Sequence, residues 1–246
     1  MTNSVQIIPF TNLALAFIPV FVVAGILYKW TSEGSHTLYA VFRMLVQLLL
    51  IGYFLIFIFE SDSAWVVMTV LIVMLCTSSW IALRTIKTQR LFLYRKAFLA
   101  ITLGGGITLL LITQGVLGLD PWYWPRYLIP LAGMIFANAM NSVSLAAERL
   151  TAEMERDVQY EQARNIAFRA SLIPIINSLL AVGLVSLPGM MTGQILSGVS
   201  PLIAVRYQIM VMCMVFASAG ISSACFLKFL EPQHTNQLGK KKSGQL

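Results

Sequence analysis

The sequence predicts an all-α integral membrane protein with about seven transmembrane helices, its amino terminus outside the cell and its carboxyl terminus in the cytoplasm. Of the 246 residues, 58% are hydrophobic and only 11% are charged, whereas a soluble domain carries about 25% charged residues. Long uncharged runs separate the few charges, and nearly all basic residues fall on one of the two sides that these runs define.

The uncharged runs are long enough to form helices that cross a bilayer. A spanning helix needs about 20 apolar residues, and the runs lack the alternation of barrel strands. The first run has no basic residue before it and no small-residue cleavage site, so we interpret it as a span and not as a signal peptide. The expected transmembrane domain covers 1–230, with spans near 9–28, 38–59, 64–83, 97–117, 127–147, 170–187 and 204–227.

The basic residues predict the orientation of these spans, because cytoplasmic loops are enriched in Lys and Arg. With the amino terminus outside, 15 of the 17 basic residues lie in or next to the cytoplasm. Only Arg126 and Arg206 lie outside. The last segment, 231–246, is then a basic cytoplasmic tail. The net charge of +7 is explained in the same way and does not indicate a nucleic-acid partner.

Two connecting segments are unusual. The inner segment 148–169 carries five acidic residues and four arginines, and Leu150, Met154 and Val158 would form one apolar stripe on a helix that extends the fifth span. It is either a solvated connector or a docking surface for a cytoplasmic partner. The outer segment 188–203 is rich in Gly and Pro and is either an ordinary loop or a re-entrant turn buried in protein.

Polar residues inside the expected spans are candidates for a transport pathway, because polar side chains in a membrane normally face the bundle interior or a water-filled cavity. The alternative is hydrogen bonding between helices that holds the bundle together. The candidates come from the second, fifth and sixth spans and from the last outer loop: Arg43, Gln47, Asn138, Asn141, Asn177 and Gln194.

The sequence contains no signature of soluble-enzyme chemistry. It has no Gly-Lys-Ser/Thr phosphate loop, so the chain is not expected to hydrolyse ATP. No His, Cys and carboxylate cluster has metal-site spacing. The thioethers of Met190 and Met191 could bind a soft metal ion, although methionine is more often packing material, so no metal site is assigned with confidence.

Several motifs resemble the FetB-type iron-export permeases of ABC transporters, a bacterial family related to plant aluminium-tolerance half-transporter permeases. The most distinctive stretch runs through the end of the sixth span and the outer loop, and shorter matches lie in the second and fifth spans. These segments are Ile173-Pro-Ile-Ile-Asn177, Val182-Gly-Leu-Val-Ser-Leu-Pro-Gly-Met-Met-Thr-Gly-Gln-Ile-Leu196, Ala204-Val-Arg-Tyr-Gln-Ile209, Arg43-Met-Leu-Val-Gln-Leu48 and Gly133-Met-Ile-Phe-Ala-Asn-Ala-Met-Asn141.

The resemblance implies a permease subunit in the inner (plasma) membrane of a bacterial cell. It implies a homodimer, a separate ATP-binding subunit that uses ATP in place of any cofactor on this chain, and ATP-driven export of iron or another metal ion. On this interpretation Glu153, Arg156 and Glu161 contact the ATP-binding subunit. The segment Pro188, Gly189, Met190, Met191, Thr192 and Gly193 forms an outer gate.

One segment departs from the family pattern. The inner loop before the sixth span carries a Leu-Gly-Ala-Thr type element in the family, comparable to a coupling helix, and the segment 149–171 lacks it. Glu161-Gln-Ala163 would be its remnant. An ATP-independent secondary transporter or channel remains the alternative function, although the sequence has no mid-span carboxylate for a proton relay.

Overall fold

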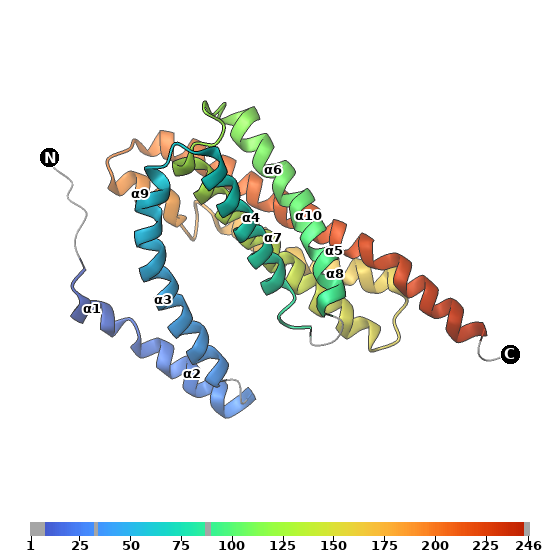
Figure 1. The fold of residues 1–246 in the computed structure, drawn as a ribbon. Helices are drawn as coiled ribbons and strands as arrows, with labels where there is room; N and C mark the ends of the chain where they lie inside the picture. Colours follow the sequence, from blue (N-terminus) through green and yellow to red (C-terminus); the bar gives the residue numbers. More distant parts are fainter. Residues whose placement is uncertain (1–7, 32–33, 87–89, 244–246) are drawn as a thin grey trace. The chain divides into compact units, whose positions relative to one another are not determined.

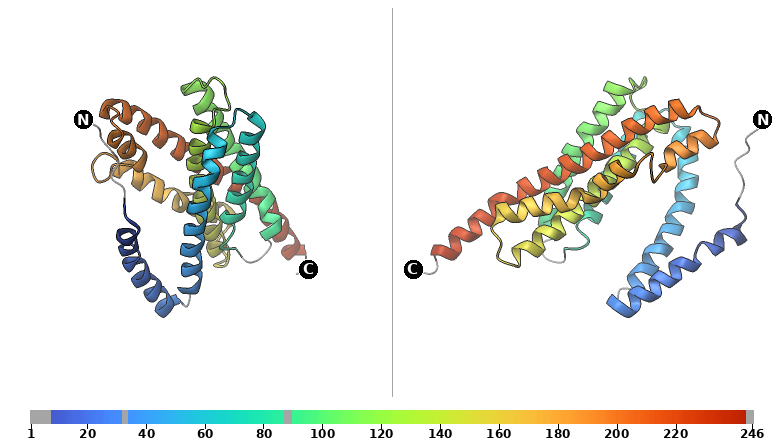
Figure 2. Two further views of the ribbon diagram at one scale, coloured as in Figure 1. Left: turned by 60° about the vertical axis from the view of Figure 1, so that its left-hand side comes forward. Right: turned by 180° about the vertical axis from the view of Figure 1, so that it is seen from behind.

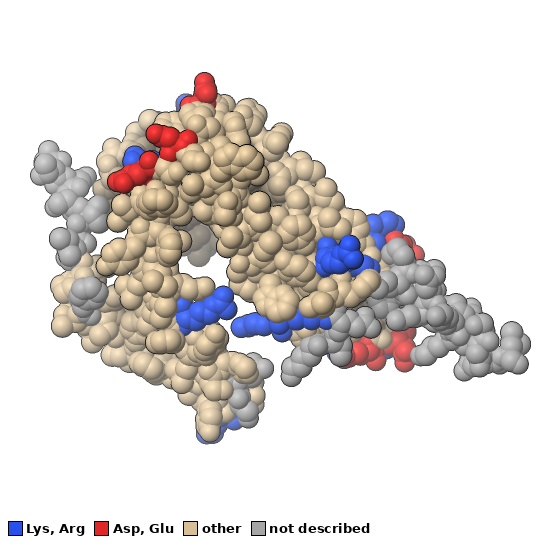
Figure 3. Space-filling view, viewed as in Figure 1, with Lys and Arg blue, Asp and Glu red and all other residues tan. Residues whose placement is uncertain are grey.

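The computed structural model describes residues 8–31, 34–86 and 90–243 and divides into two compact units. The first unit comprises Met1–Ser61 with Leu196–Gly198, and the second comprises Asp62–Ile195 with Val199–Leu246. The described residues form helices and turns, without strands, so the predicted all-α membrane fold is confirmed. Uncharged residues cover most of the face shown in Figure 3.

The first unit is a pair of long apolar helices preceded by a short one. The short helix α1 is Phe10–Leu15, and it is followed by α2, Ile18–Thr31, and α3, Gly34–Phe59. The helices α2 and α3 pack against each other (Figure 1). Gly34 makes this contact possible, since a Cβ atom there would lie 2.6 Å from the Cβ atom of Tyr28.

The second unit is built around α7, Pro125–Met154, which packs against α4, Ala64–Ala82, and against α8, Tyr160–Ala181, and α10, Pro201–Ser243 (Figures 1 and 2). A composite helix fills the remaining side of α10. It consists of α5, Arg90–Ile101, the π-helical turn η1, Thr102–Gly106, the short α6, Ile107–Leu110, and a second π-helical turn η2, Leu111–Val116. The helix α9, Gly189–Leu196, precedes α10.

Six described helices are long and apolar enough to cross a membrane, and six of the seven predicted spans overlap them, ending at most two residues beyond them. These helices are Thr11–Thr31, Gly34–Phe59, Ala64–Ala82, Arg90–Val116, Pro125–Met154 and Pro201–Glu231. The predicted span 170–187 is the exception. It coincides with the second half of α8, whose first half carries Glu161, Arg164 and Arg169, and the helix ends at Ala181.

The predicted apolar stripe of the inner segment is wrong at one position. Leu150 and Met154 lie on α7, but the helix ends before Val158. The amide of Val158 donates to the carbonyl of Glu153, and the amide of Asp157 donates to that of Met154. With Asp157 at φ 57°, this is the Schellman pattern that terminates helices. Val158 therefore lies in the connection to α8 and not on α7.

Candidate transport pathway and docking surface

Two predicted pathway residues, Arg43 and Gln47, lie one turn apart on α3 and are exposed. Gln47 is about 20 Å along a helix of about 39 Å, so it lies near the middle of this apolar span. A polar side chain at that depth needs a polar partner or water, because lipid provides neither. Neither side chain has a hydrogen-bond partner among the described residues, so α3 presents a polar patch that suits contact with protein or with a water-filled path.

The three predicted asparagines lie on the paired helices α7 and α8, but they are not brought together as one buried site. Asn138 is half-buried, and its side-chain amide donates to the carbonyl of Met134 at 2.8 Å in its own helix. Asn141 on α7 and Asn177 on α8 are exposed. Two of the predicted amides are thus exposed on the neighbouring helices α7 and α8.

Buried hydroxyl groups form the contacts between these helices instead. Ser142 is 3% exposed and donates from Oγ to the carbonyl of Ser171 on α8 at 3.4 Å. On α10, Ser218 is fully buried and donates to the carbonyl of Ile135 on α7 at 3.5 Å. These bonds join α7 to both neighbours, so the interhelical role that we considered for the asparagines belongs to the serines.

A buried polar stripe on α10 was also missed. Gln208 is 5% exposed, and its side-chain oxygen is buried without a hydrogen-bond donor in the described part of the chain. Ser222, further along the same helix, has a buried Oγ atom that also has no hydrogen-bond partner among the described residues. The predicted Gln194 on α9 is half-buried, and its side-chain oxygen likewise lacks a donor.

At the charged end of α7, a buried carboxylate organises two arginines. Glu153 is 5% exposed, although we expected it to contact a partner. Its Oε1 atom lies 2.7 Å from Arg149 Nη2 and 3.5 Å from Arg156 Nη1. Glu153 therefore positions the two arginines, and Arg156, whose side chain is 67% exposed, presents the charge to solvent.

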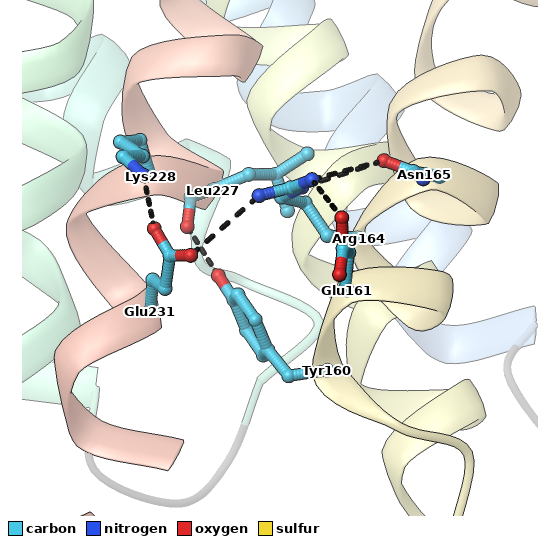
Figure 4. A network of polar contacts seen from close by, with 7 residues as sticks. All are labelled: Tyr160, Glu161, Arg164, Asn165, Leu227, Lys228 and Glu231. Carbon is cyan, nitrogen blue, oxygen red and sulfur yellow. Dashed lines mark hydrogen bonds and ion pairs between the residues drawn. The ribbon is translucent and has the colours of Figure 1, made fainter. Parts of the chain in front are cut away.

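A second network ties the start of α8 to α10 (Figure 4). The hydroxyl of Tyr160 donates to the carbonyl of Leu227. Arg164 lies 3.7 Å from Glu161 on its own helix and 3.7 Å from Glu231 on α10, and Lys228 pairs with Glu231. Burial, with a contribution from the negative charge of Glu231, raises the pKa of Tyr160 to about 12, so this hydroxyl stays a hydrogen-bond donor at any physiological pH.

The predicted outer gate, 188–193, covers the first part of α9. Thr192 donates from Oγ1 to the carbonyl of Pro188 at 3.1 Å, and its amide donates to the same carbonyl. Gly189 and Gly193 are exposed, and Met191 is half-buried. Met190 lines a cavity together with Met134 of α7 and Met210 of α10. Within the described residues, no group of three or more His, Cys, Asp or Glu side chains is placed so that it could hold a metal ion.

The comparisons with known proteins agree with this membrane architecture. The model of a family described as "Uncharacterised protein family (UPF0014)" matches residues 10–163 and 157–234. The chain is 36% identical to the "Probable iron export permease protein FetB" of Escherichia coli, over 94% of this chain and 98% of that one. It is 36% identical to a UPF0014 membrane protein of Synechocystis, over 87% and 89% of the two chains. It is 33% identical to the Arabidopsis thaliana protein "ALUMINUM SENSITIVE 3", over 85% and 81%. No solved structure matches the chain.

Proposed function

Because the chain belongs to the UPF0014 family, we propose that it is the permease subunit of an ATP-driven ABC exporter of iron or another metal ion in a bacterial inner membrane. A separate ATP-binding subunit would bind and hydrolyse ATP. The name of the Escherichia coli relative supports the transport of iron. The multi-pass membrane architecture supports a permease, and the six long apolar helices agree with it.

The observation that carries the proposal is the convergence of three helices at the charged end of the second unit. The end of α7 and the start of α8 are joined by a connection of five residues, 155–159. Arg164 and Tyr160 link the start of α8 to α10. A push on this connection would therefore reach all three helices at once, which is what an ATP-binding subunit must do to switch a permease between two states.

The exposed charges of this end form the proposed docking surface, which we define as Glu155, Arg156, Asp157 and Glu161. The side chains of Arg156 and Glu161 are 67% and 81% exposed, so both can meet a partner without repacking the helices. The family match consists of two parts that overlap at 157–163, next to and within this surface. We infer that this chain docks its partner with a shorter element than its relatives.

A second copy of the chain completes the proposed pathway. Asn141 and Asn177 are exposed on helices that cross or enter the bilayer, and an amide facing lipid is costly. A homodimer that brings these amides to its centre would replace lipid by protein and water. Asn138, Arg43, Gln47 and Gln194 would contribute polar groups to the same path, which the metal ion would follow with part of its water shell.

The direct test is the ATPase activity of the chain, co-expressed with the ATP-binding subunit and reconstituted in proteoliposomes, with and without ferrous iron. We expect co-purification and hydrolysis that iron stimulates. The double variant Arg156→Glu, Glu161→Arg should abolish the stimulation by iron. The control is Arg206→Glu, which should leave the stimulation intact, because Arg206 is exposed near the start of α10 and lies outside the docking surface. Equal loss in both variants would contradict the docking assignment.

The pathway has its own test. Alanine at Asn138, Asn141 and Asn177 together should reduce iron export while the complex still assembles and hydrolyses ATP. Unchanged export at normal expression would show that the pathway lies elsewhere. Export without any ATP-binding subunit would favour the second candidate function, an ATP-independent transporter or channel, for which the missing coupling element is the specific argument.

A further inference from the structure

A cavity of about 320 Å³ lies within the second unit, at the end of α7 opposite the docking surface. Its walls come from Leu117, just after η2, and from α7, α9 and α10. Two leucines and a proline contribute to an almost entirely apolar lining. The other lining residues are Arg126, Tyr127, Met134, Met190, Tyr207 and Met210.

The size and lining of the cavity exclude a bound metal ion as its natural occupant. Three thioethers could in principle ligate a soft cation. However, the cavity is roughly ten times the volume of one water molecule, which is far larger than a single ion. Arg126, whose side chain contributes to the lining, also carries a positive charge that would repel a cation. The cavity suits an apolar body, because Met side chains adapt to flexible hydrocarbon.

Arg126 adds a preference for negative charge. It is exposed and forms no ion pair with the acidic residues that the structure describes. Beside it, the rings of Trp124 and Tyr127 pack with centroids 5.3 Å apart. Trp and Tyr gather at the level of lipid headgroups. An apolar cavity lined by one unpaired arginine, with two aromatic rings next to that arginine in the chain, suits the apolar chain and the charged headgroup of a phospholipid.

We propose that this cavity, which we name the Met134–Met190–Met210 cavity, binds one acyl chain of an anionic phospholipid whose phosphate contacts Arg126. The site holds α9 against α7 and α10, because Met190 of α9 is part of its wall. A bound lipid therefore stabilises the segment that connects α8 to α10. The inference depends on the membrane location of the chain and not on the proposed function.

The test is native mass spectrometry of the delipidated full-length protein titrated with dioleoyl phosphatidylglycerol. We expect saturable binding that weakens about tenfold in Arg126→Gln, since a hydrogen bond to a charged group is lost. Arg206→Gln is the matched control, because Arg206 is exposed near the start of α10 but does not line the cavity. It should bind within twofold of the parent protein. Equal weakening in the two variants would overturn the proposal, since it would indicate unspecific surface attraction.

The second arm tests the acyl chain. Met190→Trp should fill the cavity and displace the lipid, and Met191→Trp, next to it but outside the lining, should not. Two ligand-side controls apply if a variant fails to fold. Dihexanoyl phosphatidylglycerol and inorganic phosphate should each bind at least tenfold more weakly than the dioleoyl lipid. Equal binding of dioleoyl phosphatidylcholine, or competition by inorganic phosphate at the same concentration as the lipid, would refute the lipid site.

Discussion

Gly104 is the residue at which the fold tolerates a side chain least. A Cβ atom there would lie 2.5 Å from the backbone nitrogen and 2.9 Å from the Cα atom of Ser222 on α10. Neither atom can move without shifting the helix, so we expect Gly104→Ala to lower the free energy of unfolding by about 1–3 kcal/mol. Thermal unfolding in detergent measures this loss.

The matched control for Gly104 lies two residues further on. A Cβ atom on Gly106 would meet nothing within 4 Å, and alanine favours helix over glycine by about 1 kcal/mol. Gly106→Ala should therefore unfold at the same temperature as the parent protein or higher. A Gly104→Ala variant as stable as Gly106→Ala would mean that η1 and α10 are further apart than the structure has them.

Tyr160 should make the stability of the protein depend on pH above about pH 10. Its pKa is raised to about 12, chiefly by burial, whereas an unfolded chain ionises its tyrosines near pH 10. The folded state therefore holds this proton longer, and stability falls as the pH rises from about 10 to about 12. The decrease in stability between pH 10 and pH 12 that Tyr160 causes should be absent in Tyr160→Phe. This variant also loses the hydrogen bond to the Leu227 carbonyl, which contributes about 1 kcal/mol. Unfolding curves at pH 8, 10 and 11.5 would test both effects, and parallel falls in the two proteins would contradict the assignment.

Among the structural elements, the end of α7 depends on one backbone conformation. Asp157 adopts φ 57° in the Schellman turn that begins the docking surface. Glycine adopts this conformation without cost, so Asp157→Gly should raise the free energy of unfolding by up to about 1 kcal/mol. The β-branched Asp157→Val should lower it by about 1–2 kcal/mol. Asp157→Asn tests the two causes separately. If the backbone conformation determines stability, this variant should have the same free energy of unfolding as the parent protein, and if the charge does, the two should differ.

The uncharged runs of the sequence predicted the positions of six long helices. The predicted span 170–187 does not match the bounds of α8, and this difference has a physical reason. Charged residues interrupt an apolar run in the sequence, but they do not end a helix when they form ion pairs. Arg164 forms such pairs with Glu161 and Glu231. The uncharged part of α8 from Ala170 to Ala181 is only about 18 Å long. The end of α7 at Met154 was also not predicted. The residue in the left-handed conformation is Asp157, and aspartate indicates a helix end less clearly than glycine does.

The candidate site was predicted less well than the fold, because it depends on which helix faces are covered. The residues proposed for docking were chosen by their charge, and the structure buries Glu153 between two arginines. Arg126, Pro130 and Met134 recur every four residues, so a stripe on α7 was visible in the sequence. Nothing in the sequence indicated that Met190 and Met210 would close a cavity over that stripe. Such contacts between distant segments are decided by the packing of the whole unit.

For the whole molecule, the distribution of basic residues predicts an outside amino terminus, and this orientation requires α8 to carry the chain back across the bilayer. The helix is about 33 Å long, close to the thickness of the hydrocarbon core. Its apolar part is shorter, so the irregular residues 182–188 would have to be buried in protein at membrane depth. Whether α8 crosses therefore decides on which side α10 begins.

Single cysteines at Asp120, Glu155 and Ser200, in a protein whose three native cysteines are replaced by serine, test this crossing with a membrane-impermeant maleimide on intact cells. All three positions are exposed and lie before α7, after α7 and just before α10. We expect Asp120→Cys and Ser200→Cys to react, and Glu155→Cys to react only after the membrane is opened. If Ser200→Cys behaves like Glu155→Cys, α8 stays on the cytoplasmic side. The chain would then have six spans, and the pathway that we propose between α7 and α8 would lose its second wall.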